Sequence, residues 1–211
     1  LMIINVHYRF MKKASYYTFL FCLLTTAPIL AQNNLATLEF KDGKQRKGLA
    51  KLIGGDQIKF KKAKGQKAEK FHFSELQKAV IYDSEEPSTY VYIETPKGRF
   101  NVVKELEIGA VNLYVLEEKG YAPPMQMGGA NGHMNVTGGN FYDLQNLYVK
   151  SGENGELTHL GSNQLFSKNF KKAASDYFSN CPELVKKIQN RDFKKKHVKD
   201  IVHYYNTKCN L

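Results

Sequence analysis

Apolar and polar residues alternate along most of the segment from Leu35 to Lys119, and this pattern restricts the fold more than any other feature. Successive side chains of a strand point to opposite faces, so such alternation is typical of strands half buried against a core. Ala36, Leu38 and Phe40 are the first instance. We therefore expect residues 32–118 to form an antiparallel β domain, either a small barrel or a sandwich.

Turn motifs separate these alternating runs. Asp42-Gly43, Gly54-Gly55-Asp56 and Pro96-Lys97-Gly98 combine residues that preset or accept the backbone angles of a tight turn. Ser74 is placed to open a single helical turn. Residues 111–116 are apolar at nearly every position, which is typical of a central strand covered on both faces. Hairpin spacing of this kind predicts roughly seven short strands.

The segment that follows changes character twice. Residues 119–141 are rich in Gly, Met, Asn and Pro and carry almost no charge, which predicts a linker or a long loop. Residues 142–161 then contain two strand-like runs on either side of Gly152-Glu153-Asn154-Gly155. This arrangement predicts a β-hairpin.

Residues 162–211 show helical periodicity instead. Apolar residues recur there at the three- and four-residue intervals that bring side chains to one face of a helix. Pro182 stands where a second helix would begin. We expect a tail of two or three short helices, and so an α+β fold in total, with these apolar positions inside: Phe166, Phe170, Ala173, Ala174, Tyr177, Phe178, Leu184, Val185, Ile188, Val198, Ile201, Val202 and Tyr205.

Two cysteines of the tail, Cys181 and Cys209, lie on these apolar stripes. One opens a helix and the other closes its antiparallel neighbour, so their sulfur atoms are expected to meet. A redox-active pair or a metal site is the alternative, but the Cys-x-x-Cys spacing typical of both is missing. We therefore predict a structural disulfide, Cys181–Cys209, which an oxidising compartment would preserve.

Residues 1–31 resemble a secretory signal peptide. Lys12 and Lys13 precede an apolar run from Ala14 to Leu24, and small residues follow it. Met11 is the expected start, and cleavage after Ala31 is the expected processing step. The mature protein would then be periplasmic or secreted.

Two other readings of this leader are less favoured. An uncleaved anchor needs about 20 predominantly apolar residues to cross a bilayer, whereas this run is shorter and is interrupted by Pro28. A lipoprotein signal would use Cys22, but the bulky Phe21 before it stands where such signals carry a small residue. We expect no transmembrane span in the mature chain.

The chain is basic, with a formal net charge of +11. Residues 1–31 contain three basic side chains and no acidic one, so removing them leaves 28 basic against 20 acidic residues. Nucleic acid is an improbable target outside the cytoplasm, so we expect an envelope macromolecule or an anionic surface as partner. A solvated face is the plainer reading of the two lysine groups: Lys59, Lys61, Lys62, Lys64, Lys67 and Lys70, and Lys194 to Lys196.

Several motifs of the tail and of the β region resemble uncharacterised secreted or periplasmic proteins of Bacteroidota-type bacteria. The resemblance implies a lineage and a compartment, and it implies no activity. It rests on Tyr177-Phe178, Cys181-Pro182, Leu184, Ile188, Ile201-Val202, Tyr205-Asn206 and Cys209, on the Ala31-Gln32 junction, and on residues 109–114.

No motif for catalysis or for a cofactor is present. His72, His159, His197 and His203 lack the Gly-x-Ser-x-Gly or His-Glu-x-x-His context of hydrolases, so we assign no catalytic residue. Thioether and imidazole groups suit copper, but their spacing here is loose and an incidental Met-rich loop is the plainer reading. These weak metal candidates are Met125, Met127, His133 and Met134.

The function predicted from sequence is accordingly a non-catalytic exported protein that binds a macromolecule or an anionic surface. The alternatives are an extracytoplasmic enzyme with an unrecognised site and a weak copper-binding protein.

Overall fold

The computed structural model describes residues 33–83, 85–122, 126–128, 134–136, 140–152, 155–163 and 169–209. Residues 34–211 form one compact unit. Its strands are β1 (Asn34–Phe40), β2 (Gln45–Leu52), β3 (Gln57–Lys61), β4 (Glu69–His72), β5 (Leu76–Tyr82), β6 (Ser88–Thr95), β7 (Arg99–Glu107), β8 (Val111–Ala122), β9 (Gln126–Gly128), β10 (Met134–Val136), β11 (Asn140–Ser151) and β12 (Thr158–Ser162). Its helices are η1 (Phe73–Glu75), α2 (Phe170–Tyr177), α3 (Pro182–Gln189), η2 (Lys195–His197), α4 (Val198–Tyr204) and η3 (Tyr205–Cys209).

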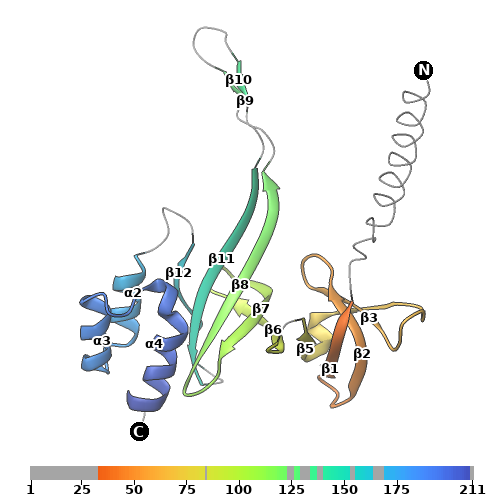
Figure 1. Cartoon of the computed structure of the whole chain (residues 1–211), viewed down its shortest axis with the longest axis horizontal. Helices are drawn as coiled ribbons and strands as arrows, with labels where there is room; N and C mark the ends of the chain where they lie inside the picture. Colours follow the sequence, from red (N-terminus) through yellow and green to blue (C-terminus); the bar gives the residue numbers. More distant parts are fainter. Residues whose placement is uncertain are drawn as a thin grey trace, which may run out of the picture. The chain divides into compact units, whose positions relative to one another are not determined.

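Ten of the strands form one antiparallel sheet in the order β12-β11-β8-β7-β6-β5-β1-β2-β3-β4 (Figure 1). The predicted α+β class with an antiparallel β-rich part is therefore confirmed. The sheet is not closed, since β12 and β4 are its two edges. The expected turns are present: Gly43 and Gly98 adopt φ values of 82° and 70° in the β1–β2 and β6–β7 hairpins, where a side chain would be strained.

The sequence pattern places the central segment differently from the structure. Residues 119–122, expected in a linker, continue β8, and Asn140 already belongs to β11. These two strands pair from Val111–Ser151 to Ala122–Asn140, so the predicted hairpin of β11 and β12 joins the same sheet as the N-terminal strands. The far half of this ribbon has no further strand beside it in Figure 1, and Phe141 there is 88% exposed.

The inner face of β1 to β5 encloses the first core. Alternate residues of each strand supply it, as the sequence pattern predicts, and Phe73 of η1 fills its centre. Arg46 lies over the rings of Phe40 and Phe71 at the margin of this core, 5.5 and 5.1 Å from their centroids, and pairs with Glu69 at 2.9 Å. The fully or nearly buried residues are Ala36, Leu38, Ala50, Ile58, Phe60, Phe73, Leu76, Ala79 and Ile81.

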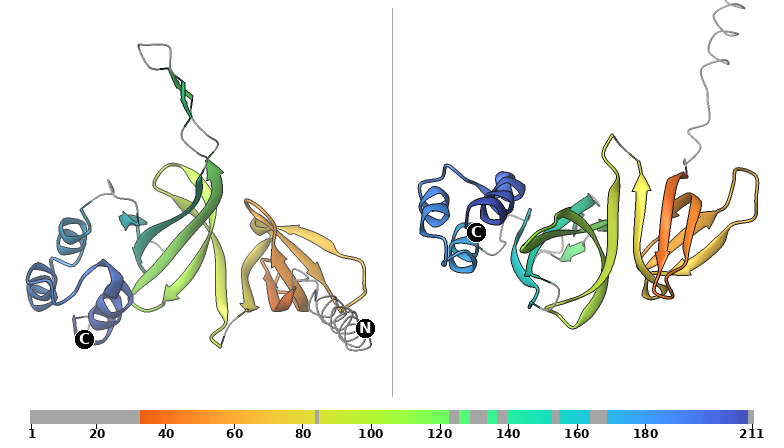
Figure 2. Two further views of the ribbon diagram at one scale, coloured as in Figure 1. Left: turned by 45° about the horizontal axis from the view of Figure 1, so that its top comes forward. Right: turned by 90° about the horizontal axis from the view of Figure 1, so that it is seen from below.

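Strand β8 is buried on both faces, as expected for residues 111–116. Leu113 pairs with Val149 of β11 and belongs to the core under the helices, whereas Tyr114 pairs with Tyr148 and belongs to a core on the opposite face. Both views in Figure 2 place the helices on one side of these strands. Tertiary packing is decisive for the helices, since 8 residues in α2 and α3 and 7 in α4 are too few to be stable alone.

The predicted disulfide is present. Cys181 immediately precedes Pro182, the first residue of α3, and Cys209 ends η3. Their sulfur atoms are bonded and their Cα atoms lie 5.7 Å apart. Closing a loop over 28 positions stabilises the fold by about 3.5 kcal/mol in the chain-entropy account.

A second fastening joins the tail to the sheet. The side-chain oxygen of Asn206 accepts the backbone N–H of Val111 at 2.8 Å, and its nitrogen donates to the carbonyl of the same residue at 2.9 Å. Gly109 lies against this amide so closely that a Cβ there would collide with it. The Asn206 side chain therefore acts as a short strand partner for the start of β8.

Candidate anion-binding face

Three lysines face one another across β2, β3 and β4. Lys59 on β3 pairs with Lys51 on β2 and with Lys70 on β4, so the three lie side by side on the outer face of the sheet. We call them the lysine ladder. Directly opposed residues of antiparallel strands have Cβ atoms about 4.5–5.5 Å apart, and like charges at that spacing destabilise the folded state.

The surroundings of the ladder add positive charge. Lys61 on β3 pairs with Leu49, a neighbour of Lys47 and Lys51 on the same face of β2. The connection between β3 and β4 carries three more exposed lysines, Lys62, Lys64 and Lys67. The register of β2, β3 and β4 therefore brings the ammonium groups of several lysines to one surface.

No acidic side chain of the described residues forms an ion pair with a ladder lysine. In the described part of the chain, lysine and arginine form ion pairs at Lys44–Asp42, Arg46–Glu69, Lys78–Glu39 and Lys119–Asp143, and no pair includes a ladder lysine. Glu69 is next to Lys70 in sequence, but it points to the other face, where it meets Arg46. The ladder thus keeps its charge available for an external anion.

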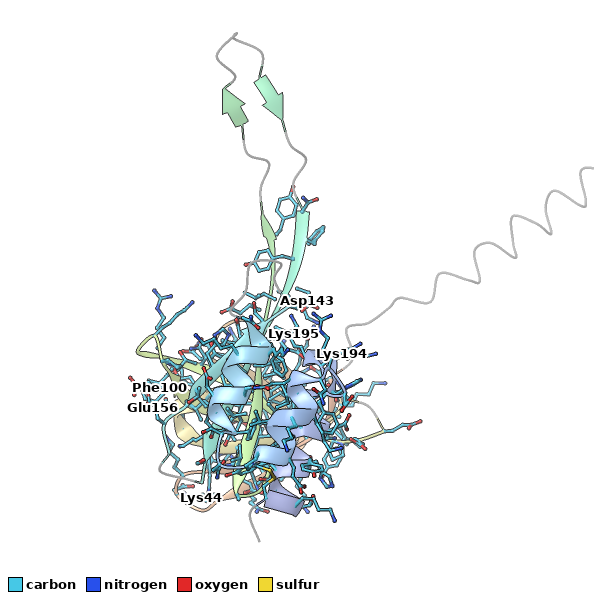
Figure 3. The ribbon with its side chains drawn as sticks, turned by 90° about the vertical axis from the view of Figure 1, so that its left-hand side faces the viewer. Lys44, Phe100, Asp143, Glu156, Lys194 and Lys195 are labelled. Carbon is cyan, nitrogen blue, oxygen red and sulfur yellow. A yellow bond between two sulfur atoms is a disulfide. The ribbon has the colours of Figure 1, made fainter. Side chains whose placement is uncertain are left out.

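The second lysine run, Lys194 to Lys196, is organised differently. Lys195 donates from Nζ to the carbonyl oxygen of Ser162 on β12 at 2.6 Å. Figure 3 labels Lys194 and Lys195 beside the helices. Because its middle lysine fastens η2 to the sheet, this run is a poorer candidate for an anion site than the ladder.

His72 is part of a polar cluster with Asp56, Ser74 and Tyr92. The backbone N–H of Ser74 donates to Nδ1 of His72 at 3.0 Å, so Nδ1 is an acceptor and Nε2 carries the proton. Nε2 then donates to Oδ2 of Asp56 at 2.6 Å, and the hydroxyl of Tyr92 donates to the same oxygen at 3.4 Å.

This cluster has the residue types of a hydrolase triad without its geometry. The Nδ1 lone pair that would activate the Ser74 hydroxyl, 2.6 Å away, already accepts the Ser74 N–H and caps η1. A general base needs a free lone pair toward the nucleophile. The cluster instead links the β2–β3 turn, through Asp56, to the end of β4 and to η1.

The other three histidines in the described part of the chain, His159, His197 and His203, lie in separate settings. His159 on β12 packs against Tyr148 with ring centroids 5.0 Å apart. Nδ1 of His197 accepts the backbone N–H of Lys194 at 3.4 Å, and His203 contacts Glu107 at 2.9 Å. The structure brings none of them to His72 in any contact it describes.

Of the copper candidates, Met125 and His133 lie outside the described residues. Met127 and Met134 belong to β9 and β10, whose backbones pair, and their side chains are likewise not described. Among the described residues no group of three or more His, Cys, Asp or Glu is arranged to hold a metal ion. The same residues include no helix with the length and apolar character needed to span a bilayer.

Comparisons with protein-family models, with curated proteins and with solved structures returned no match for this chain.

Sequence reasoning identifies Lys59 and Lys70 as outward-facing but does not single out Lys51. Alternation shows which residues of a strand share a face, whereas the pairing of Lys51 with Lys59 depends on the register between two strands. The symmetric placement of both lysines around the Gly54-Gly55 turn is the signal that could have suggested it.

Proposed function

We propose that this chain is a non-enzymatic exported protein, periplasmic or secreted, that binds an anionic macromolecule or surface through Lys51, Lys59 and Lys70. The lysine ladder is the observation that carries the proposal. Like charges on directly opposed strand residues destabilise the free protein, and a bound anion would offset their repulsion. Among the described residues, no ion pair with an acidic side chain includes any of the three lysines.

Two further features support the compartment. The Cys181–Cys209 bond persists readily where thiols oxidise, and the leader-like sequence of residues 1–31 would direct the chain there. Mass spectrometry of the natural product tests this part. We expect an N-terminus at Gln32 and no free thiol at either cysteine, and an intact leader with two free thiols would contradict it.

The shared chemistry of the ligand is closely spaced negative charge, which phosphate head groups or acidic sugars both supply. The binding experiment has one arm for each source: vesicles containing phosphatidylglycerol, and alginate, a polysaccharide of uronic acids. Protein expressed with its own leader is titrated with both, at low and at physiological salt.

The decisive variant is Lys51→Gln/Lys59→Gln/Lys70→Gln. A lysine near an anionic surface contributes about 1 kcal/mol, so loss of three should weaken binding roughly 100-fold. The matched control, Lys171→Gln/Lys186→Gln/Lys199→Gln, removes three exposed lysines from the helices and the same net charge. If both variants weakened binding equally, net charge alone would explain the effect, and the assignment of binding to the lysine ladder would be refuted. Absence of binding to both ligands would refute it as well.

A further inference from the structure

A hollow of about 680 Å³ lies on one face of β6, β7 and β8, beside the turn between β2 and β3. Its lining includes Tyr90, Phe100 and Val102 from the strands and residues 54–56 from the turn. Pockets of roughly 300–1,000 Å³ are the usual size for small-molecule ligands. The hollow is separate from the lysine ladder, because none of the three ladder lysines lines it.

An exposed aromatic platform forms part of this hollow. Phe100 is 55% exposed, and its ring packs on that of Tyr92, with centroids 5.3 Å apart and planes 32° from parallel. The ring of His72 then meets Tyr92 edge-on at 5.6 Å. Tyr92 and His72 therefore support the Phe100 ring, which remains more than half exposed. Phe100 is labelled in Figure 3.

A fixed carboxylate stands beside the platform. Both hydrogen bonds to the Asp56 side chain, from His72 and from Tyr92, use Oδ2. Among the described residues Oδ1 has no hydrogen-bond donor, so it remains an acceptor for a ligand hydroxyl. Gly54 and Gly55 adopt φ values of 50° and 59° with open space where a Cβ would be, which keeps this side of the hollow uncrowded.

The charge of the walls argues against an anionic ligand here. The lining contains three acidic residues, Asp56, Glu117 and Glu118. It contains two lysines, Lys104 and Lys119, and Lys119 is paired with Asp143 at 3.3 Å. The ligand suited to such a site has an apolar face for the ring and hydroxyl donors for the carboxylate. Pyranose sugars have both, because their axial C–H groups form a flat apolar patch and their hydroxyls donate hydrogen bonds.

We propose that this hollow binds a neutral oligosaccharide, with one sugar ring stacked on Phe100 and a hydroxyl bonded to Oδ1 of Asp56. The inference is independent of the ladder and concerns a second ligand class.

Isothermal titration of the full protein with chitohexaose, cellohexaose and maltohexaose, each up to millimolar concentration, tests the site. We expect saturable binding of at least one of them. Phe100→Ala should weaken that binding at least tenfold, because truncation removes the stacking surface, and circular dichroism should show an unchanged fold since Phe100 is largely exposed. Asp56→Asn should weaken it as well.

Phe141→Ala is the matched control, since it removes an exposed phenylalanine far along the β8–β11 ribbon. It should bind like the wild type, and so should the triple ladder variant. Absence of binding to all three hexasaccharides, or equal affinity of Phe100→Ala and wild type, would overturn the proposal. Loss of sugar binding in the ladder variant would overturn its independence from the anion-binding face.

Discussion

The contact between Asn206 and Val111 gives the sharpest test of how the helical tail is attached to the sheet. Replacing Asn206 by alanine removes an acceptor at 2.8 Å and a donor at 2.9 Å from the two backbone groups of one residue. Val111 is only 1% exposed, so its N–H and carbonyl would lose both partners in a largely dry setting. A buried polar group without a partner costs about 1–3 kcal/mol.

Leaving both groups without a partner should lower the free energy of unfolding by about 2–5 kcal/mol. The lower end is expected if water enters the half-buried space that the Asn206 side chain leaves. For a chain of this size each kcal/mol shifts the melting temperature by roughly 2–4 °C. We therefore expect Asn206→Ala to melt about 5–15 °C below the wild type.

Thermal and urea unfolding followed by circular dichroism would measure this difference. Asn190→Ala serves as control, because Asn190 is an exposed residue at the end of α3 and its loss should change stability by less than about 0.5 kcal/mol. A melting temperature of Asn206→Ala within 1 °C of the control would refute the reasoning.

Two further predictions concern the disulfide and a half-buried carboxylate. Cys181→Ser/Cys209→Ser should lose about 3.5 kcal/mol and melt roughly 7–14 °C lower, and a reducing agent should lower the melting temperature of the wild type but not of this variant. Burial raises the pKa of Glu105 above 4.5, with Lys78 acting in the opposite direction, so the charged form is disfavoured in the folded state. The contribution of Glu105 to stability is therefore complete below its unfolded-state pKa and is lost as pH rises through the raised pKa of the folded state. Glu105→Gln should accordingly raise the melting temperature at neutral pH and flatten its decline as pH rises above the ordinary pKa of a glutamate. An unchanged pH profile would contradict this assignment.

Local sequence signals were sufficient for the elements that depend on neighbouring residues. The turns at Gly43 and Gly98 follow from the conformational freedom of glycine, and the helical tail follows from its apolar stripe. The pairing of Cys181 with Cys209 follows from their positions at opposite ends of neighbouring helices, and the structure confirms it.

The pairing of strands that are distant in the sequence could not be predicted from such local signals. Strands β8 and β11 pair although residues 123–139 separate them in the sequence. Alternation within a strand shows which side chains share a face, but it does not show which other strand will lie beside it. The polar residues Glu117 to Lys119 resemble the end of a strand in sequence because the apolar run of residues 111–116 stops before them. In the structure they continue β8, since their backbone groups pair with β11 instead.

The candidate sites depend on the same missing information. Lys51, Lys59 and Lys70 come together only through the register of β2, β3 and β4. Phe100 and Asp56 belong to segments 44 positions apart in the printed sequence, and only the folded sheet brings both to one hollow.

The salt dependence of binding tests the central claim, the action of the lysine ladder, most directly. Each ammonium group that engages an anion releases about one counterion, so the logarithm of affinity falls linearly with the logarithm of salt concentration. For the anionic ligand that binds, we predict that the slope for Lys51→Gln/Lys59→Gln/Lys70→Gln is shallower than the wild-type slope by about 2–3. Equal slopes for the two proteins would contradict the assignment of the anion-binding face to these three lysines.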